Sequence, residues 1–208
     1  MKATAPRRTQ EARSEETRGR LLEATIALLF ERGLTRLTTP DIARRAGVSR
    51  GALTHHFANR EEIVVTALAV QLDAATFGLR QFCDARPAPM MSTDDVVDHL
   101  WPMMADRLFY TTLEYLPEAR HNHGFRNQLL PVVVEFHAAL DAIWTRLAES
   151  HQVPPEQARV AMNATMCLIR GMIAQTVLRD DPAYFQEMLR YWKAHLRASL
   201  HGARARAA

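Results

Sequence analysis

The chain has 208 residues, of which 26 are Lys or Arg, 23 are Asp or Glu and 48% are hydrophobic. This length suits one globular unit or two small helical ones, and the balance of residues is typical of a protein with a buried core. The longest runs without a charge, 63–72 and 160–169, have ten residues each, whereas a membrane-spanning helix needs about 20. Residues 1–13 are basic and lack the apolar stretch of a signal peptide. We therefore expect a cytoplasmic chain that does not contact a membrane.

Basic residues are concentrated in the first quarter of the chain. Residues 1–57 contain 11 Lys or Arg and 6 Asp or Glu, a net charge of +5, whereas residues 58–208 carry −2. Such an excess is expected where a protein meets a polyanion, although many basic segments are only solvated.

The metal-ligating residue types form no convincing site. The two cysteines, Cys83 and Cys167, form no CxxC pair and flank no histidine at ligand spacing. His121 and His123, with His99, are a weak zinc pattern because no cysteine or HExxH helix accompanies them. We expect a reduced chain without a metal or a cofactor.

Helical periodicity runs through nearly the whole chain, and no segment shows the alternation of a strand. The first helix is expected from about Glu16 to Arg32, because Gly33 can adopt the left-handed conformation that ends a helix. Three further helix starts are expected at the capping residues Thr38, Ser49 and Asn59. Longer helices are expected at 59–85 with Gly78 as a candidate break, at 93–101, at 102–119, from the turn at 122–124 to about 150, at 154–179 and at 182–202, with a loop at 86–89. The expected fold class is therefore all-α.

The stretch 38–57, TTPDIARRAGVSRGALTHHF, has the spacing of a helix-turn-helix. Ala43 lies where the first helix must approach the second closely, and Gly47 lies at the turn, where a positive φ is needed. The apolar residues that would hold the pair against the preceding helix are Ile42, Val48, Leu53 and Phe57. The rest of the second helix is small or polar, which suits entry into the major groove. An ordinary helical hairpin would explain the alanine and the glycine, but not the caps and apolar positions as well.

Residues 21–68, LLEATIALLFERGLTRLTTPDIARRAGVSRGALTHHFANREEIVVTAL, resemble the N-terminal domain of the tetracycline-repressor (TetR) family. The resemblance implies a homodimer with two N-terminal DNA-binding heads. It also implies a larger helical C-terminal domain that dimerises and binds a small effector, which lowers the affinity for DNA. One position departs from the family pattern: Thr54 stands where the family often has a tyrosine, and threonine cannot supply the same aromatic contact to phosphate.

Four regions are expected along the chain. Residues 1–14 form a flexible basic tail, and residues 15–62 form the helix-turn-helix DNA-binding domain. Residues 63–202 form the effector-binding and dimerisation domain, followed by a disordered tail at 203–208. The arginines of the N-terminal tail suit a minor groove, although disorder is expected in the absence of DNA.

Contacts to DNA divide into those that grip phosphate and those that read bases. Phosphate contacts are expected at helix starts and along the recognition helix, from Thr38, Thr39, His55, His56 and Arg60. Base contacts are expected from Arg50, Ala52 and Thr54, because an arginine can form two hydrogen bonds with guanine. The remaining members of the expected interface are Arg44, Ser49 and Gly51; Ser49 is also explained as a cap only, and Arg44 as part of a solvated face.

The helix expected at 154–179 has apolar residues on two opposite faces, which indicates burial on both. One row, which includes Met162, Met166 and Ile169, is expected to pack within its own domain. The other row has small residues that would let a partner helix come close, together with the helix that carries residues 140–147. The expected dimer interface consists of Leu140, Trp144, Ala164, Cys167, Gly171, Ala174 and Leu178. Burial inside a monomer is the alternative.

Methionines and aromatic residues suit an adaptable apolar pocket. The expected effector pocket consists of Trp101, Met104, Phe109, Tyr110, Phe125, Phe136 and His137, with His137 as the polar partner of an apolar effector. For any one of these residues, ordinary core packing is the alternative.

The sequence therefore predicts a sequence-specific DNA-binding transcriptional regulator, namely a repressor released from a palindromic operator by a small apolar effector. One alternative is a dimeric regulator that needs no effector. Another is an enzyme that converts a small molecule, but the sequence contains no Gly-rich phosphate loop, nucleophile elbow or paired carboxylates. We expect no catalytic activity.

Overall fold

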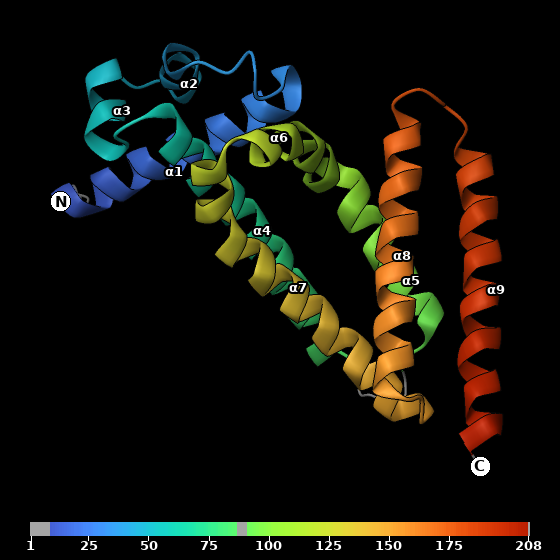
Figure 1. Ribbon diagram of the computed structural model, residues 1–208. Coiled ribbons are helices and arrows are strands. Elements are labelled where there is room, and N and C mark those ends of the chain that lie inside the picture. The colour runs from blue at the N-terminus through green and yellow to red at the C-terminus, as the bar shows by residue number, and fades with distance from the viewer. Residues whose placement is uncertain (1–8, 87–90, 208) are drawn as a thin grey trace, which may run out of the picture. The chain divides into compact units, whose positions relative to one another are not determined.

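The structure, a computed structural model, describes residues 9–86 and 91–207, and these residues form helices without a strand (Figure 1). The all-α prediction is confirmed. The elements are α1 (Gln10–Arg32), α2 (Thr39–Ala46), α3 (Arg50–His56), α4 (Arg60–Asp84), α5 (Thr93–Met103), the π-helical turn η2 (Met104–Leu108), α6 (Phe109–His121), α7 (His123–His151), α8 (Pro155–Thr176) and α9 (Pro182–Ala207). Residues 1–8 of the expected tail and most of the loop expected at 86–89 lie outside the described residues.

Several helices differ from their expected bounds for local reasons. Helix α1 begins at Gln10 rather than near residue 16, because the Thr9 side chain accepts a hydrogen bond from the Ala12 backbone at 3.2 Å and caps the helix. Helix α4 continues through Gly78, so the expected break is wrong. Pro102 lies inside α5 and lacks a backbone N–H, and the chain then passes through the π-helical turn η2. Helix α9 continues to Ala207, beyond its expected end at 202.

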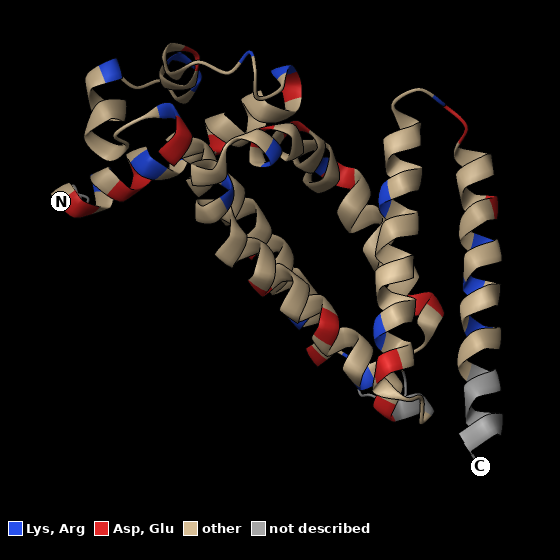
Figure 2. Cartoon of the chain, in the orientation of Figure 1, with Lys and Arg blue, Asp and Glu red and all other residues tan. Residues whose placement is uncertain are grey.

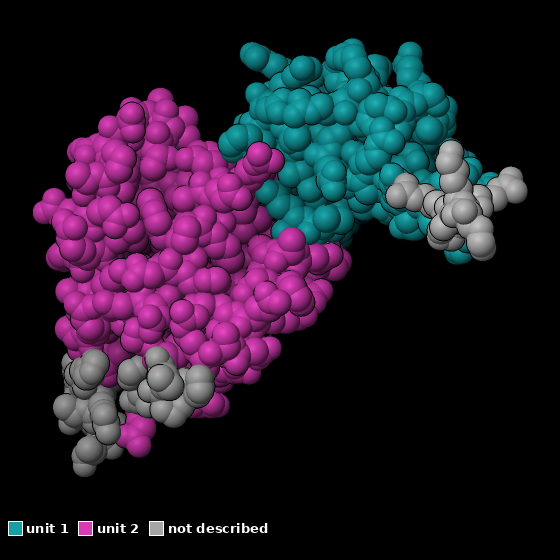
Figure 3. Space-filling view, turned by 180° about the vertical axis from the view of Figure 1, so that it is seen from behind, with its two compact units in different colours: residues 1–71, 114–129 teal, residues 72–113, 130–208 magenta. Residues whose placement is uncertain are grey.

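The chain divides into two compact units (Figure 3). Unit 1 consists of residues 1–71 and 114–129, and unit 2 consists of residues 72–113 and 130–208. Unit 1 therefore contains the helix-turn-helix together with a segment far along the chain. Both α6 and α7 contribute residues to each unit, since the division falls within these helices.

The core of unit 1 pins the helix-turn-helix to α1. Leu21 and Leu28 of α1 and Ile42 of α2 are fully covered, and so are Leu53 of α3 and Phe57, which directly follows α3. Three of the four apolar positions that the sequence pattern selects, Ile42, Leu53 and Phe57, are thus buried, and the fourth, Val48, is half-buried. Their removal from water stabilises the packing of α2 and α3 on α1. The polar face of α3 is thereby left outside.

A half-buried histidine ring of unit 2 stacks on a phenylalanine of the core. The imidazole of His99 in α5 stacks on Phe82 of α4, with 4.1 Å between the ring centroids. Its Nε2 atom is buried and has no hydrogen-bond partner among the described residues. Burial, and then the charge of Arg86, lower the pKa of His99 below its ordinary value. The structure therefore favours the neutral imidazole.

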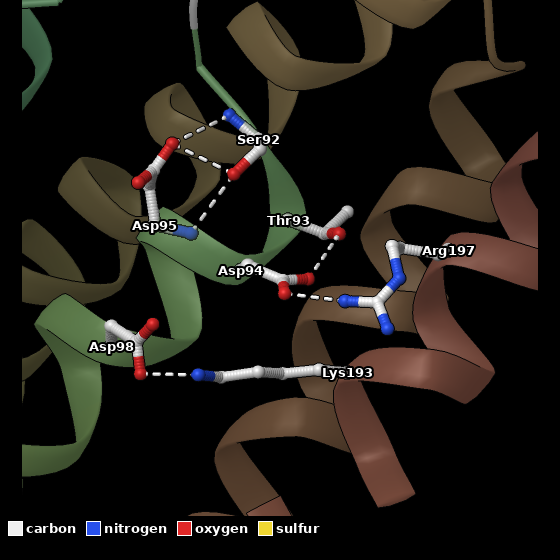
Figure 4. A network of polar contacts seen from close by, with 7 residues as sticks. All are labelled: Ser92, Thr93, Asp94, Asp95, Asp98, Lys193 and Arg197. Carbon is white, nitrogen blue, oxygen red and sulfur yellow. Dashed lines mark hydrogen bonds and ion pairs between the residues drawn. The ribbon is translucent and has the colours of Figure 1, made fainter. Parts of the chain in front are cut away.

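Ion pairs hold α9 against α5 on the surface of unit 2 (Figure 4). Asp94 pairs with Arg197, and Asp98, one turn further along α5, pairs with Lys193, one turn earlier on α9. This order requires the two helices to run antiparallel. The start of α5 is fixed by a capping box, in which Ser92 Oγ accepts from the Asp95 backbone at 3.1 Å and the Asp95 carboxylate accepts from the Ser92 backbone at 3.1 Å.

We expect His99→Phe to reduce the pH dependence of stability. The folded chain holds the pKa of His99 below its ordinary value of 6.5, so below that pH the unfolded chain binds more protons than the folded chain. The wild-type free energy of unfolding should therefore fall between about pH 7 and about pH 5. The variant should show a smaller fall, because phenylalanine binds no proton, while its ring preserves the stacking on Phe82. Urea unfolding at both pH values measures the difference, with the exposed His121→Phe as the control. Equal pH dependence in wild type and His99→Phe would contradict the expectation.

Candidate nucleic-acid interface

The two helix starts of the helix-turn-helix are capped by their own side chains. Thr38 Oγ1 accepts a hydrogen bond from the Asp41 backbone at 3.3 Å and donates one to the Asp41 carboxylate at 2.6 Å. This hydroxyl, followed by the charges of Arg44 and Arg32, lowers the pKa of Asp41. Ser49 Oγ accepts from the Ala52 backbone at 3.1 Å. Both expected caps are confirmed, and they fix where α2 and α3 begin.

The turn between α2 and α3 needs a glycine and is held by an arginine. Gly47 has the left-handed backbone (φ +65°, ψ +37°), and its N–H bonds the Arg44 carbonyl at 3.2 Å. Arg20 of α1 donates to the carbonyl of Ala46 and, at 3.1 Å, to that of Gly47. A Cβ at position 47 would lie 2.8 Å from the Arg20 guanidinium. No sequence motif indicates this role for Arg20, because its two partners lie 26 and 27 residues further along the chain.

The outward face of α3 carries the expected base-reading residues. Arg50, Gly51, Thr54 and His55 are exposed, and Ala52 and His56 are half-buried. The Thr54 hydroxyl donates back to the Gly51 carbonyl at 3.1 Å, within its own helix. A hollow of about 60 Å³ brings together Thr39 of α2 with Arg50, Leu53 and Thr54 of α3. The start of α2 and the polar face of α3 thus form one surface.

The arginines of this region differ in what their guanidinium groups contact. Arg44 pairs with Asp41, and Arg45 makes two hydrogen bonds with Glu31, at 2.7 and 3.1 Å. The guanidinium of Arg50 makes no hydrogen bond or ion pair with any residue that the structure describes, although its backbone carbonyl accepts from the Thr54 hydroxyl at 3.3 Å. Figure 2 shows basic residues on both α2 and α3. Arg50 is therefore the arginine of the helix-turn-helix whose donors remain available to a base.

The guanidinium of Arg60, an expected phosphate contact, donates to main-chain carbonyls of unit 1. Its Nε donates to the Leu37 carbonyl at 2.8 Å, and its Nη2 donates to the Leu34 carbonyl. These bonds fasten the start of α4 to the connection between α1 and α2. Arg60 is thus a structural clamp in this structure, and its expected phosphate contact stays a prediction.

The residues expected to form an effector pocket are divided between the two units. Phe125 is buried in unit 1, whereas Met104, Phe109 and Phe136 are buried in unit 2, so the effector pocket stays a prediction. The exposed His137 lies 3.5 Å from Arg170, and partial burial and that arginine lower the pKa of His137.

Trp101 borders a hollow at the end of α8 and the start of α9. The hollow has a volume of about 220 Å³ and is lined by Trp101, Thr176, Arg179, Asp180, Asp181, Pro182, Phe185 and Gln186. The rings of Trp101 and Phe185 are stacked, with 6.3 Å between their centroids. The Tyr110 hydroxyl lies 2.6 Å from that of Thr176, so two of the expected pocket residues approach this hollow.

The expected dimer interface divides into buried and exposed residues. Leu140 and Trp144 of α7 are 0% and 1% exposed, so their own chain covers them and they cannot face a partner. On α8, Cys167 and Gly171 are exposed, Ala164 and Ala174 are half-buried, and Leu178 just beyond the helix is 94% exposed. The opposite row of α8 is buried within unit 2, with Met162, Met166, Ile169 and Ile173.

A further exposed row lies on α9, which the sequence did not single out. Tyr191 is 74% exposed, and Ala194 and Ala198 are exposed on the following turns. Helices α8 and α9 pack side by side in unit 2 (Figure 1), where Trp192 Nε1 donates to Thr165 Oγ1 at 3.0 Å. Small and apolar side chains therefore remain uncovered on both of the last two helices.

Two other properties concern metals and membranes. No group of three or more His, Cys, Asp or Glu side chains among the described residues is arranged to hold a metal ion. One helix, α4, is long and apolar enough to cross a membrane by composition alone, and 44% of its most apolar window is buried inside the structure. A core helix of a globular protein passes the same test, so this is weak evidence for a membrane span.

Comparisons with known proteins agree with this geometry. Residues 21–67 match the family model of the bacterial regulatory proteins of the tetR family. The chain is 25% identical to the HTH-type transcriptional regulator CymR of Pseudomonas putida, over 88% of this chain and 90% of CymR. It is 37% identical to the HTH-type transcriptional repressor KstR2 of Mycobacterium tuberculosis, over 39% of this chain and 44% of KstR2. The crystal structure of the transcriptional regulator FadR of Bacillus subtilis, in complex with stearoyl-CoA, has a TM-score of 0.67 at 17% identity, over 88% and 98% of the two chains.

Residues 21–67 form a helix-turn-helix domain of the tetR family of bacterial regulatory proteins, as the residues of this stretch predict. The chain is a DNA-binding transcriptional regulator.

We expect Arg50→Ala to relax the preference for one base pair in each half-site. A bidentate arginine–guanine contact contributes about 1–3 kcal/mol of discrimination, and the guanidinium of Arg50 makes no bond within the described structure that would compete. Binding titrations on a set of half-site variants measure the change. Arg45→Ala is the matched control, because Glu31 already holds that guanidinium. An equal loss on every sequence for Arg50→Ala would show that this residue contacts only phosphate.

Proposed function

We propose that the protein is a repressor that binds a palindromic operator as a homodimer and leaves it when a small apolar effector binds. Unit 1 is the DNA-binding domain and unit 2 the effector-binding and dimerisation domain in this proposal, and the protein acts in the cytoplasm without catalysis. The observation that carries the proposal is the exposed face of α3, which has small side chains and begins with Arg50, whose guanidinium has no partner among the described residues. The naming of KstR2 as a repressor supports the direction of regulation.

The DNA surface combines readout with positioning. Helix α3 enters the major groove, where Arg50 reads a guanine and Ala52 and the methyl group of Thr54 face a thymine methyl. Thr38 and Thr39 present the start of α2 to a phosphate, since free N–H groups and the helix dipole favour an anion there. His55 and His56 lie further along α3 and contact the backbone. Ser49 caps the start of α3, and Gly51 leaves that turn without a bulky side chain. Arg44 adds a positive charge beside it.

Selection of bound sequences from random duplexes tests the DNA-binding proposal. The expected result is a palindrome whose half-sites lie about 34–36 Å apart, or a multiple of that distance. The selected operator then allows the effector to be sought, because a compound that binds unit 2 should release the DNA. Enrichment of no sequence at low ionic strength would refute the proposal, and enrichment of a single half-site would refute its dimeric form.

The homodimer is proposed to form through the exposed rows of α8 and α9. Val160 is 59% exposed and continues the α8 row through Cys167 and Gly171 toward Leu178. Isolated exposed apolar residues are ordinary, but a continuous row with small residues at its centre allows a second helix to approach closely. A second copy of the same face, with the Tyr191 row of α9 beside it, buries these residues in a symmetric contact.

We expect Gly171→Arg to convert the dimer into a monomer. A Cβ at this position would meet no atom within 4 Å, so the substitution leaves the packing of the single chain unchanged. A charged side chain in the centre of the proposed contact would instead separate the two copies. Light scattering measures the mass, and Ala74→Arg on the exposed side of α4 is the control. A monomeric wild type, or a Gly171→Arg variant that stays dimeric, would contradict this interface.

The effector is proposed to bind in unit 2, with its apolar part against the rings of Trp101 and Phe185. These rings and the nearby Tyr110–Thr176 pair combine an apolar wall with a few polar groups, as ligand sites commonly do. FadR of Bacillus subtilis, whose fold this chain shares, carries stearoyl-CoA in its crystal structure. Stearoyl-CoA is therefore a reasonable first compound for the release experiment.

A further inference from the structure

Unit 1 contains a carboxylate that comes from far along the chain. Glu114 is the first residue of the segment 114–129, which belongs to unit 1 although it follows the helix-turn-helix by many residues. It lies in α6, whose first residues, 109–113, belong to unit 2. The Leu34 backbone N–H donates to Glu114 Oε2 at 3.0 Å, across a separation of 80 residues. A bond between an amide and a carboxylate is stronger than one between neutral groups.

The backbone at this point leaves room for the carboxylate only because the preceding residue is glycine. Gly33 ends α1 with a φ of +76°, and its own N–H bonds the Leu29 carbonyl at 3.0 Å. A Cβ at Gly33 would overlap the Glu114 carboxylate. The positive φ and the close approach therefore both require glycine at the same residue.

The Leu34 peptide groups are held by two ionised side chains of opposite charge. Glu114 accepts from the N–H of Leu34, and Arg60 donates to its carbonyl and to that of Leu37. Leu34 itself is buried. The connection from α1 to α2 is thus fixed by α6 on one side and by α4 on the other, immediately before Thr38 begins the helix-turn-helix.

A second set of bonds fastens the same segment to unit 1. Glu61 of α4 accepts from Asn122 Nδ2 at 3.1 Å and from Gln128 Nε2 at 3.0 Å. Asn122 is the single residue between α6 and α7, and its side chain also accepts from the Phe125 backbone at 3.0 Å. These bonds hold residues 122–128 in place, so Glu114 sits on a segment that is itself anchored.

We propose that Glu114 is a positioning residue for DNA binding. Its carboxylate fixes the turn at residues 33–38 and so sets where the start of α2 meets a phosphate, although Glu114 does not touch DNA. The inference rests on the proposed DNA contact of Thr38 and Thr39. It also means that the DNA-binding head is incomplete without a residue of α6.

Glu114→Leu and Glu114→Gln in the full-length protein test this role. Leucine removes the acceptor, whereas glutamine keeps a carbonyl oxygen that can accept from Leu34. We expect Glu114→Leu to weaken binding to the selected operator by about tenfold and Glu114→Gln by less than about twofold. Loss of a negative charge alone would strengthen binding to DNA. The weaker binding expected for Glu114→Leu is therefore opposite to the change in affinity that a charge effect would cause. Glu187→Leu, exposed on α9, is the control for the same change of charge.

Amide hydrogen exchange gives a readout that does not depend on DNA. The Leu34 amide should be protected in wild type and in Glu114→Gln, and should exchange faster in Glu114→Leu while the amides of α1 keep their protection. Unchanged operator affinity in Glu114→Leu, or a loss that glutamine does not restore, would overturn the proposal. A wild type that binds no duplex would instead overturn the proposed function, so the two failures are distinguishable.

Discussion

The bend at Gly47 is the constraint on which the DNA-binding surface depends. A left-handed residue there reverses the chain between two short helices, and an L side chain would be strained in that conformation. Arg20 of α1 completes the bend by donating to two carbonyls at the end of α2, where the helix dipole favours a positive charge. With the bend fixed, burial of Leu53 and Phe57 leaves α3 only one orientation, with Arg50 and Thr54 outward.

Arginine side chains serve two different purposes in unit 1. Arg20 and Arg60 donate to main-chain carbonyls and hold the connections on either side of α2. Arg50 has no such partner in the described structure and remains available for recognition. Substitution of Arg20 or Arg60 would therefore disturb the conformation of unit 1. Substitution of Arg50 would leave that conformation unchanged and alter the base preference.

Unit 2 combines a closed core with an uncovered outer face. One side of α8 packs inward through its methionines and isoleucines, while the small residues on its other side stay at the surface. The ion pairs between α5 and α9 keep the last helix alongside this face. Such exposed ion pairs contribute little stability individually, so their main effect is to fix the register of α9.

The sequence by itself determined the local features: the caps at Thr38 and Ser49, the turn glycine and the apolar positions that bury α3. Each of these depends on backbone conformation and on residues a few positions apart, so the pattern is visible in the chain. The tertiary structure decided which polar groups meet across long separations. In the folded chain, Arg60 donates to a backbone carbonyl, Trp144 is buried, and Glu114 accepts from the Leu34 backbone. Such contacts depend on how the helices pack and not on the spacing of residues in the sequence.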